Sequence, residues 1–200
     1  MKVVLLSKTD SKIILENVPK ITKNELLSHM GFTFAIEGVS RACSHQLVRH
    51  RIASFSQQSQ RYIQMKKLDN HVVIPPSIIG EAGDLFQNFI FEASKTYHKL
   101  VEEGVSREDA RFVIPNAAET SLLMTIDGKS LMHFFGLRLC NRAQWEIRAL
   151  ANEMLLRVKE VESELFKNTG PYCIQLGYCS EGRFTCCKMG EMKERFVLKN

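Results

Sequence analysis

The sequence predicts an α+β fold, a single domain in which long helices pack on a small, mostly antiparallel sheet. The first observation is composition, because 200 residues with 44% hydrophobic and 24% charged residues are typical of a globular domain with a buried core. The second is the order of elements, since the short strand-like segments do not alternate regularly with helices as βαβ units do. The domain is expected to span residues 1–200, with a cysteine-rich tail at 171–200.

The first third of the chain is predicted to hold most of the strands. Strands are expected at residues 2–6, 11–16 and 32–37, and a short helix at 23–29. The third strand has the clearest pattern, because Phe32, Phe34 and Ile36 fall on one face at a period of two. Ser40 can then cap a helix that runs to about Arg51.

The rest of the chain is predicted to be mainly helical. A long helix capped by Ser77 should follow a strand that stops at Pro75, and it should end at Gly104. The remaining expected elements are a short helix at 106–115, a strand at 120–126 and helices at 129–138 and 143–165. The last helix is amphipathic, with Ile147, Leu150, Met154 and Val158 along one stripe.

The balance of charged residues suggests an anionic partner, because 27 Lys and Arg outnumber 22 Asp and Glu. No two of the eleven glycines are separated by a single residue, so the chain lacks the glycine-rich turn of the common dinucleotide folds. Phosphates would therefore be bound by side chains, Arg above all. No apolar run approaches about 18 residues, the length of a membrane span, and the N-terminal apolar stretch is too short for a secretory signal. We expect a cytoplasmic protein without membrane contact.

The six cysteines are expected to be reduced thiols, because a chain of this size folds without disulfides. Four of them lie in the tail, at Cys173, Cys179, Cys186 and Cys187, and could gather a zinc ion. No pair of them has the two-to-four-residue spacing of a zinc knuckle, and the adjacent last two rarely chelate one ion together. The spacing therefore predicts no metal site.

The densest group of functional side chains lies between Arg49 and Tyr62. Cations at 49–51 are followed by serines and glutamines and by Arg61, a mixture that suits phosphate recognition by guanidinium and hydroxyl groups. The cations would stand near the C-terminal end of the preceding helix, where the backbone dipole favours positive charge. The same composition also fits a basic surface for nucleic acid, and this alternative stays open.

Two motifs carry a resemblance to a known family. Arg49-His50-Arg51 is followed by Ser59 and Arg61, and a second run from Ser130 to Arg138 is followed by the stretch at 141–148. In this order, the motifs resemble those of flavin-dependent thymidylate synthases, and the likeness covers residues 32–156. Two separate motifs in the right order are more specific than either alone.

The resemblance implies an enzyme that converts dUMP to dTMP, with methylenetetrahydrofolate as the one-carbon donor and NADPH as the reductant through bound FAD. Such an enzyme is a methyltransferase and a flavoprotein of dTMP biosynthesis. Members of the family are homotetramers whose active sites form where subunits meet, so self-association is expected. Nucleic acid is then not an expected partner.

The resemblance also assigns roles to individual residues. Arg138 matches the arginine that activates the uracil ring and is the expected catalytic residue. The expected dUMP-binding residues are Gln46, Arg49, Gln57, Ser59, Gln60, Arg61 and Arg111. The expected FAD-binding residues are Arg49, His50, Arg51, Gln57, Asp127, Lys129 and His133.

The chain departs from the family pattern in three places: at Asp127-Gly128-Lys129, in a shorter N-terminal region, and at Gln57, where many members have Glu. Asp127-Gly128-Lys129 stands where the family usually has Asn-Ala-Arg, so a carboxylate and an amine replace an amide and a guanidinium near the expected adenosine part of the flavin. Two alternatives stay open beside the leading hypothesis. One is a degenerate family member that binds dUMP but not flavin, and the other is a basic nucleic-acid-binding module.

Overall fold

The computed structural model describes residues 1–63, 65 and 68–197, and these form two compact units. Unit 1 comprises Met1–Ile36, Gln46–Phe55 and Leu123–Asn200, and unit 2 comprises Glu37–His45 and Ser56–Leu122. The chain passes from one unit to the other within strands and within a short helix. The single domain over residues 1–200 stays a prediction.

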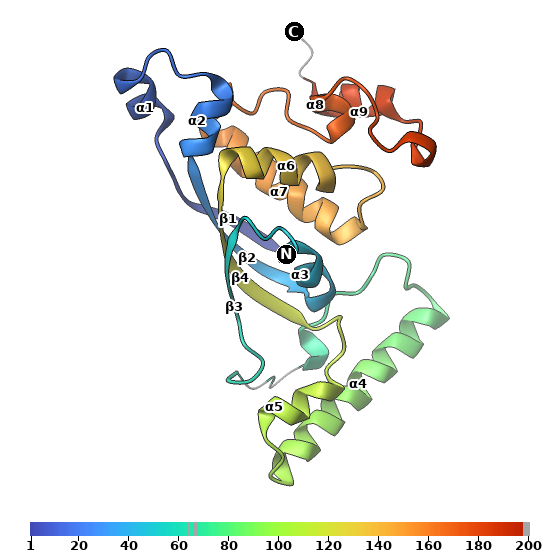
Figure 1. Cartoon of the computed structure of the whole chain (residues 1–200). Helices are drawn as coiled ribbons and strands as arrows, with labels where there is room; N and C mark the ends of the chain where they lie inside the picture. Colours follow the sequence, from blue (N-terminus) through green and yellow to red (C-terminus); the bar gives the residue numbers. More distant parts are fainter. Residues whose placement is uncertain (64, 66–67, 198–200) are drawn as a thin grey trace. The chain divides into compact units, whose positions relative to one another are not determined.

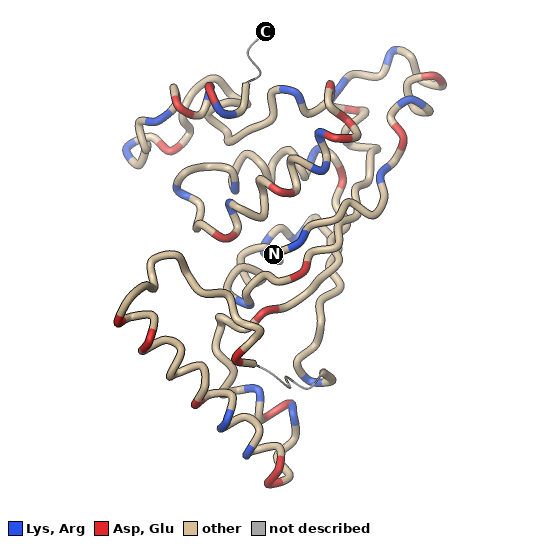
Figure 2. Tube along the Cα trace, turned by 180° about the vertical axis from the view of Figure 1, so that it is seen from behind, with Lys and Arg blue, Asp and Glu red and all other residues tan. Residues whose placement is uncertain are grey.

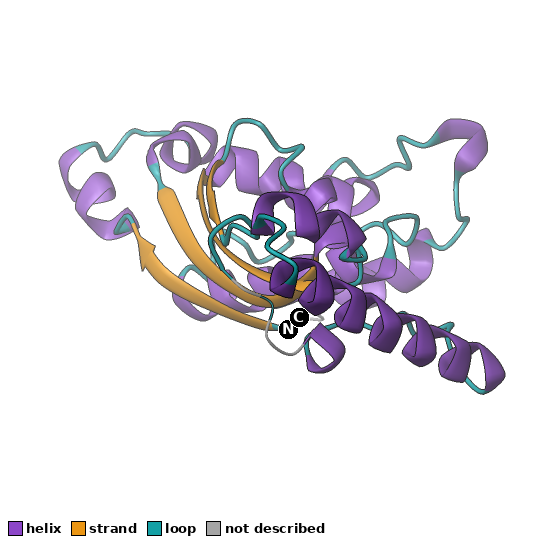
Figure 3. Cartoon of the chain, turned by 90° about the horizontal axis from the view of Figure 1, so that it is seen from below, coloured by secondary structure: helices purple, strands orange, loops and turns teal. Residues whose placement is uncertain are grey.

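The strands form one four-stranded sheet with the order β1-β2-β4-β3 (Figures 1 and 3). They are β1 (Lys2–Lys8), β2 (Gly31–Ser40), β3 (Ser54–Gln57) and β4 (Glu119–Asp127). In β2 the side chains of Phe32, Phe34 and Ile36 are fully buried, as their alternation predicts. The expected mixture of helices with a small antiparallel sheet is confirmed.

Unit 1 contains most of the helices. They are α1 (Ser11–Asn17), α2 (Lys23–His29), α6 (Gly128–Arg138), α7 (Trp145–Val161), α8 (Tyr172–Gln175), a 3₁₀ turn (Gly182–Phe184) and α9 (Met189–Phe196). Helix α7 packs on β1, and α6 contacts α2, α7 and α8 (Figure 1). The apolar stripe of α7 is confirmed, because Ile147, Leu150, Met154 and Val158 are all fully buried.

Unit 2 is built around a long helix. Its elements are α4 (Glu81–Glu102), α5 (Arg107–Ala110) and 3₁₀ turns at Leu68–Asn70 and Arg111–Val113, and α3 (Arg41–Leu47) begins in this unit. Helix α4 buries Ile90, Ala93 and Tyr97. In the part of the chain that the structure describes, Figure 2 shows Lys and Arg interspersed with Asp and Glu along the helices of this unit.

Two predictions for the first third of the chain are wrong. The strand expected at 11–16 is helix α1, because the Asp10 carboxylate caps it by accepting a hydrogen bond from the Lys12 backbone at 3.0 Å. The helix expected to reach Arg51 ends at Leu47. There the backbone N–H of His50 donates a hydrogen bond to the Leu47 carbonyl, and the backbone N–H of Arg51 donates one to the Arg49 carbonyl. The chain therefore leaves the helix in tight turns.

Three boundaries in the rest of the chain also differ from prediction. Helix α4 begins at Glu81 with Gly80, at φ 58°, as its N-cap instead of Ser77, and the strand expected before Pro75 is a single bridge. Helix α7 ends at Val161 because the buried Glu162 carboxylate is held by Lys8 at 2.5 Å and Ser11 at 2.9 Å. Helix α9 in the tail was not predicted.

None of the described helices combines the length and the apolar character needed to cross a membrane. The cytoplasmic location stays a prediction.

Candidate functional site

The turns that follow α3 line a cavity of about 320 Å³ in unit 1, which we call the charged cavity. It is lined by Arg49, His50, Arg51, Ile52, Ala53, Ile126, Ser130, His133, Leu137 and Arg138. Because α3 ends early, the three residues at 49–51 lie in tight turns and not on a helix. The structure therefore brings residues 49–51 of the first motif and part of the second motif together on one cavity, whereas Ser59 and Arg61 lie in unit 2.

Arg138 and His50 form the central polar contact of the charged cavity. The Nε of Arg138, in the last turn of α6, donates a hydrogen bond of 3.0 Å to Nε2 of His50. Burial, together with the nearby charges of Arg138 and His133, lowers the pKa of His50 to about 4. His50 is therefore neutral near pH 7, which lets its ring nitrogen accept the hydrogen bond and hold the guanidinium in place.

His133 lines the same cavity from α6. Its ring lies edge-on to His50 with 6.3 Å between the ring centroids, and its Nδ1 shares a hydrogen bond with the Tyr172 hydroxyl of α8. Burial raises the pKa of that hydroxyl, so Tyr172 stays protonated and able to donate. The tail of the chain thus helps to orient a side chain of the charged cavity.

Asp127 and Lys129 do not line the charged cavity, although their neighbours Ile126 and Ser130 do. The Asp127 carboxylate caps α6 by accepting a hydrogen bond of 2.9 Å from the Ser130 backbone. Gly128 is tightly enclosed, since a Cβ there would lie 2.8 Å from the Leu27 carbonyl oxygen of α2. The structure thus gives Asp127 a local role as the cap of α6 and leaves no room for a side chain at Gly128, and the FAD contacts of Asp127 and Lys129 stay predictions.

Gln57 lies in unit 2, on β3, and is half-buried. Its Nε2 donates to the Ser44 hydroxyl at 2.9 Å and to the Thr120 hydroxyl at 3.2 Å. These contacts fix the direction of the amide. Gln46, near the end of α3 in unit 1, is also half-buried and is not among the residues that line the charged cavity.

Ser59 and Gln60 line a small pocket of about 10 Å³ in unit 2, together with Glu119 and Thr120. The Nε2 atom of Gln60 is buried and has no hydrogen-bond partner within the part of the chain that the structure describes. A buried amide without a partner is costly, so it indicates a place where a ligand oxygen would be stabilised. The pocket is too small to hold a nucleotide by itself.

Arg61 and Arg111 converge on Glu108 in unit 2. The Arg61 guanidinium forms an ion pair of 2.8 Å with the Glu108 carboxylate, which raises the pKa of Arg61, and Arg111 Nε donates to the Glu108 carbonyl at 3.1 Å. Burial lowers the pKa of Arg41 and the charge of Arg111 lowers it further. Arg41 was not predicted as a binding residue. The sequence feature that could have indicated Arg41 is a cation at the first position of a predicted helix.

Known proteins resemble this chain in sequence. A family model described as thymidylate synthase complementing protein matches residues 5–162, a range that contains every residue of the charged cavity. A flavin-dependent thymidylate synthase from Geobacter sulfurreducens is 48% identical over 193 residues, which cover 96% of this chain and 83% of the relative. The chain belongs to the flavin-dependent thymidylate synthase family.

Other members of the flavin-dependent thymidylate synthase family agree with this assignment. A relative of that name from Clostridium tetani is 46% identical over 189 residues, covering 86% of this chain and 75% of the relative. Thymidylate synthase X from Helicobacter pylori, solved with FAD and dUMP, matches with a TM-score of 0.70 at 22% identity over 84% of this chain and 99% of its own. The likeness to the Helicobacter pylori structure shows a shared fold.

Proposed function

We propose that the protein is a thymidylate synthase that methylates dUMP to dTMP with the help of FAD. The observation that carries the proposal is the charged cavity, in which Arg138 of the second motif is held by neutral His50 of the first. The relatives named for this activity and the Helicobacter pylori structure with FAD and dUMP support it. The balanced reaction is dUMP, methylenetetrahydrofolate, NADPH and a proton to dTMP, tetrahydrofolate and NADP⁺.

The charged cavity has the chemistry that part of FAD requires. Arg49 and Arg51 are exposed at its rim and can bind a diphosphate, while Ile126 and Leu137 offer apolar surface to a flat ring. Its volume of about 320 Å³ is at the lower end of small-molecule sites. We infer that the rest of the cofactor lies against another copy of the chain, in line with the proposed homotetramer.

Within this proposal, Arg138 is the activating residue. Its guanidinium keeps its charge at all relevant pH values, so it stabilises negative charge that develops on the uracil ring. Neutral His50 fixes the direction of that guanidinium and does not compete for the substrate as a second cation. FAD, when bound, supplies the reducing equivalents that NADPH provides.

The unit 2 residues are proposed to bind dUMP. The buried Gln60 amide is a donor for a pyrimidine or sugar oxygen, and Ser59 offers a hydroxyl beside it. Arg61 and Arg111, with Arg41, supply positive charge for the phosphate. To bind that phosphate, the Arg61 guanidinium has to break its ion pair with the Glu108 carboxylate. An exposed ion pair of this kind is weak, so the exchange costs little.

The test combines binding with turnover on the full chain. FAD is added to the purified protein, its absorption spectrum is recorded with and without dUMP, and release of tritium from dUMP labelled at C5 is followed with NADPH and methylenetetrahydrofolate. We expect flavin uptake, saturable dUMP binding and dUMP-dependent tritium release. Binding of dUMP without flavin uptake would favour the degenerate family member instead. Salt-sensitive binding of unrelated oligonucleotides without dUMP binding would favour the nucleic-acid module.

A further inference from the structure

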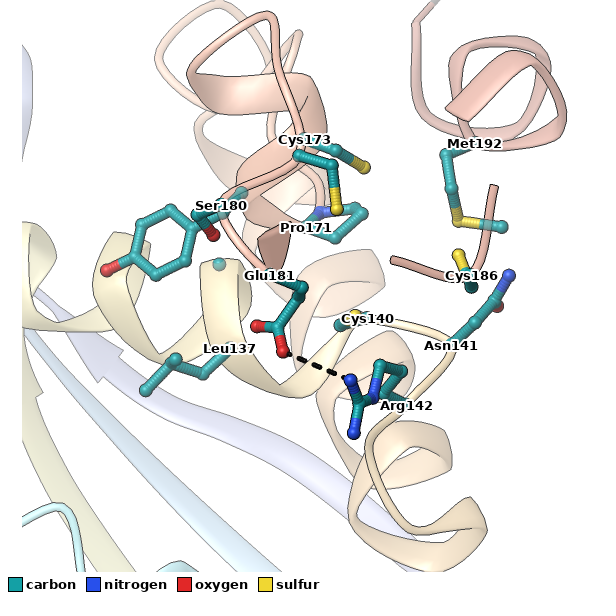
Figure 4. Close-up of a pocket in the computed structure, with 13 residues that line it drawn as sticks. Leu137, Cys140, Asn141, Arg142, Pro171, Cys173, Ser180, Glu181, Cys186 and Met192 are labelled. Carbon is teal, nitrogen blue, oxygen red and sulfur yellow. Dashed lines mark ion pairs between the residues drawn. The ribbon is translucent and has the colours of Figure 1, made fainter. Parts of the chain in front are cut away.

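Four cysteines line a second cavity in unit 1, which we call the thiol cavity (Figure 4). Cys140 follows α6, Cys173 lies in α8, and Cys179 and Cys186 lie in the tail segments between α8 and α9. The structure therefore places cysteines from three separate segments on the wall of one cavity.

The size of the thiol cavity limits what it can hold. Its volume is about 30 Å³, room for about two water molecules, so no organic cofactor fits. Four cysteines on the wall of so small a cavity supply the ligand types of a structural zinc site, in which thiolate sulfurs surround Zn²⁺ at about 2.3 Å. The walls also include Gly136, Leu137, Pro171 and Met192, and the polar side chains of Asn141, Arg142, Tyr172, Ser180 and Glu181.

We propose that Cys140, Cys173, Cys179 and Cys186 bind one zinc ion that fastens the tail to the end of α6. Four sulfur ligands leave no open position on the metal, so the site is structural and separate from the chemistry of the charged cavity. No group of three or more Cys, His, Asp or Glu already has a metal-binding arrangement in the described ranges. Binding therefore draws the thiols inward and releases their protons.

Arg142 brings a positive charge to the wall of the thiol cavity, and Glu181 partly offsets it. Zinc with four thiolates carries a net negative charge, and Arg142 lines the thiol cavity, where it lies 3.7 Å from Glu181 (Figure 4). It also donates a hydrogen bond of 2.6 Å to the Phe184 carbonyl and stacks on the Phe184 ring with 5.0 Å to the centroid. Arg142 thus positions the segment that lies between Cys179 and Cys186.

Cys187 offers a matched control for the proposal. It is exposed, adjacent to Cys186 and not among the residues that line the thiol cavity. Cys140→Ser, Cys173→Ser, Cys179→Ser, Cys186→Ser and Cys187→Ser are each purified as the full chain after expression with zinc. Metal content is measured by mass spectrometry of the elements, and folding by circular dichroism.

We expect about one zinc per chain in the wild type and in Cys187→Ser, and a loss of most of it in the other four variants. Because a serine variant can fail to fold, the wild type is also stripped of metal and titrated with Co²⁺. Thiolate-to-cobalt charge-transfer bands and tetrahedral ligand-field bands should appear at one equivalent. A chelator should lower the melting temperature of the wild type.

Three results would overturn the proposal. They are a wild type that binds neither zinc nor Co²⁺, a folded Cys140→Ser variant with its full zinc content, and disulfides among the four cysteines in protein purified without oxidant. The last result is read by mass spectrometry after alkylation. None of these measurements involves FAD or dUMP, so they are independent of the proposed function.

Discussion

The charged cavity and the thiol cavity share one helix, yet they suit opposite kinds of ligand. Ser130, His133 and Arg138 of α6 line the first, Gly136 lines the second, and Leu137 lines both. The first has about 320 Å³ and Arg and His side chains, and the second has about 30 Å³ and cysteines. Successive helical residues point about 100° apart, so one helix can serve an organic anion on one face and a single ion on another.

The two cavities are also connected to each other by a hydrogen bond. Tyr172 lines the thiol cavity and bonds to His133, which lines the charged cavity. Gly136 allows this arrangement, since a Cβ at that position would lie 2.7 Å from the Tyr172 ring. The tail is therefore placed to affect the charged cavity through one hydrogen bond.

The largest effect is expected from Arg138→Ala, which removes the activating charge from the charged cavity. Loss of one such stabilising group lowers turnover by about 100- to 1,000-fold, measured as tritium release from labelled dUMP. Zinc content should not change. The control is Arg157→Ala, which removes surface ion pairs of α7 and should leave turnover intact. Wild-type turnover in Arg138→Ala would contradict the proposed role.

Gly136→Ala should affect both cavities through Tyr172. Overpacking against the ring costs about 1 to 3 kcal/mol, partly offset by about 1 kcal/mol from the better helix propensity of alanine. We expect a net loss in the free energy of unfolding, measured in urea, together with weaker zinc retention. Gly190→Ala in α9 is the matched control, because nothing lies within 4 Å of its Cβ position, and it should not destabilise. Equal stability of the two variants would refute the close contact.

The pH dependence of stability should report on His50. Its pKa is about 4 in the folded protein against 6.5 for a free side chain, so the unfolded chain binds more protons between these values. The free energy of unfolding should therefore fall as the pH drops from 6.5 to about 4 and level off below. His50 is half-buried and partly screened by solvent, so we expect a loss of about 1 kcal/mol.

His50→Gln should remove this part of the pH dependence, measured by urea unfolding at several pH values. His45→Gln, which alters an exposed histidine of α3, serves as the control and should keep it. An unchanged slope in His50→Gln would mean that His50 is not the group whose lowered pKa causes the pH dependence.

The smallest effect is expected from Tyr172→Phe. The change removes the hydroxyl that orients His133 but keeps the ring that fills the space beside Gly136. Loss of one hydrogen bond of about 0.5 to 1.5 kcal/mol should weaken FAD binding by about two- to tenfold, measured by flavin titration. Tyr178→Phe, at an exposed tyrosine of the tail, should have no effect. Unchanged FAD affinity in Tyr172→Phe would show that the two cavities are not coupled.

Much of the fold could be predicted from local patterns. The alternation of Phe32, Phe34 and Ile36 and the stripe of α7 follow from the periods of strand and helix, and burial of one face depends only on those periods. The errors arose where single contacts decide the outcome. Asp10 caps α1 in a segment rich in isoleucine, and the ion pair of Glu162 with Lys8 ends α7 before its apolar pattern does.

The sequence by itself determined the family, the two motifs and the periodic elements, because each depends on residues that are near in the chain. Only the tertiary structure decided which distant side chains meet. It joins Arg138 to His50, and it adds Cys140 to the three tail thiols that spacing alone did not mark as a site. The physical reason is that a cavity is made where separate elements pack, and its ligand chemistry is set by whichever residues that packing brings together.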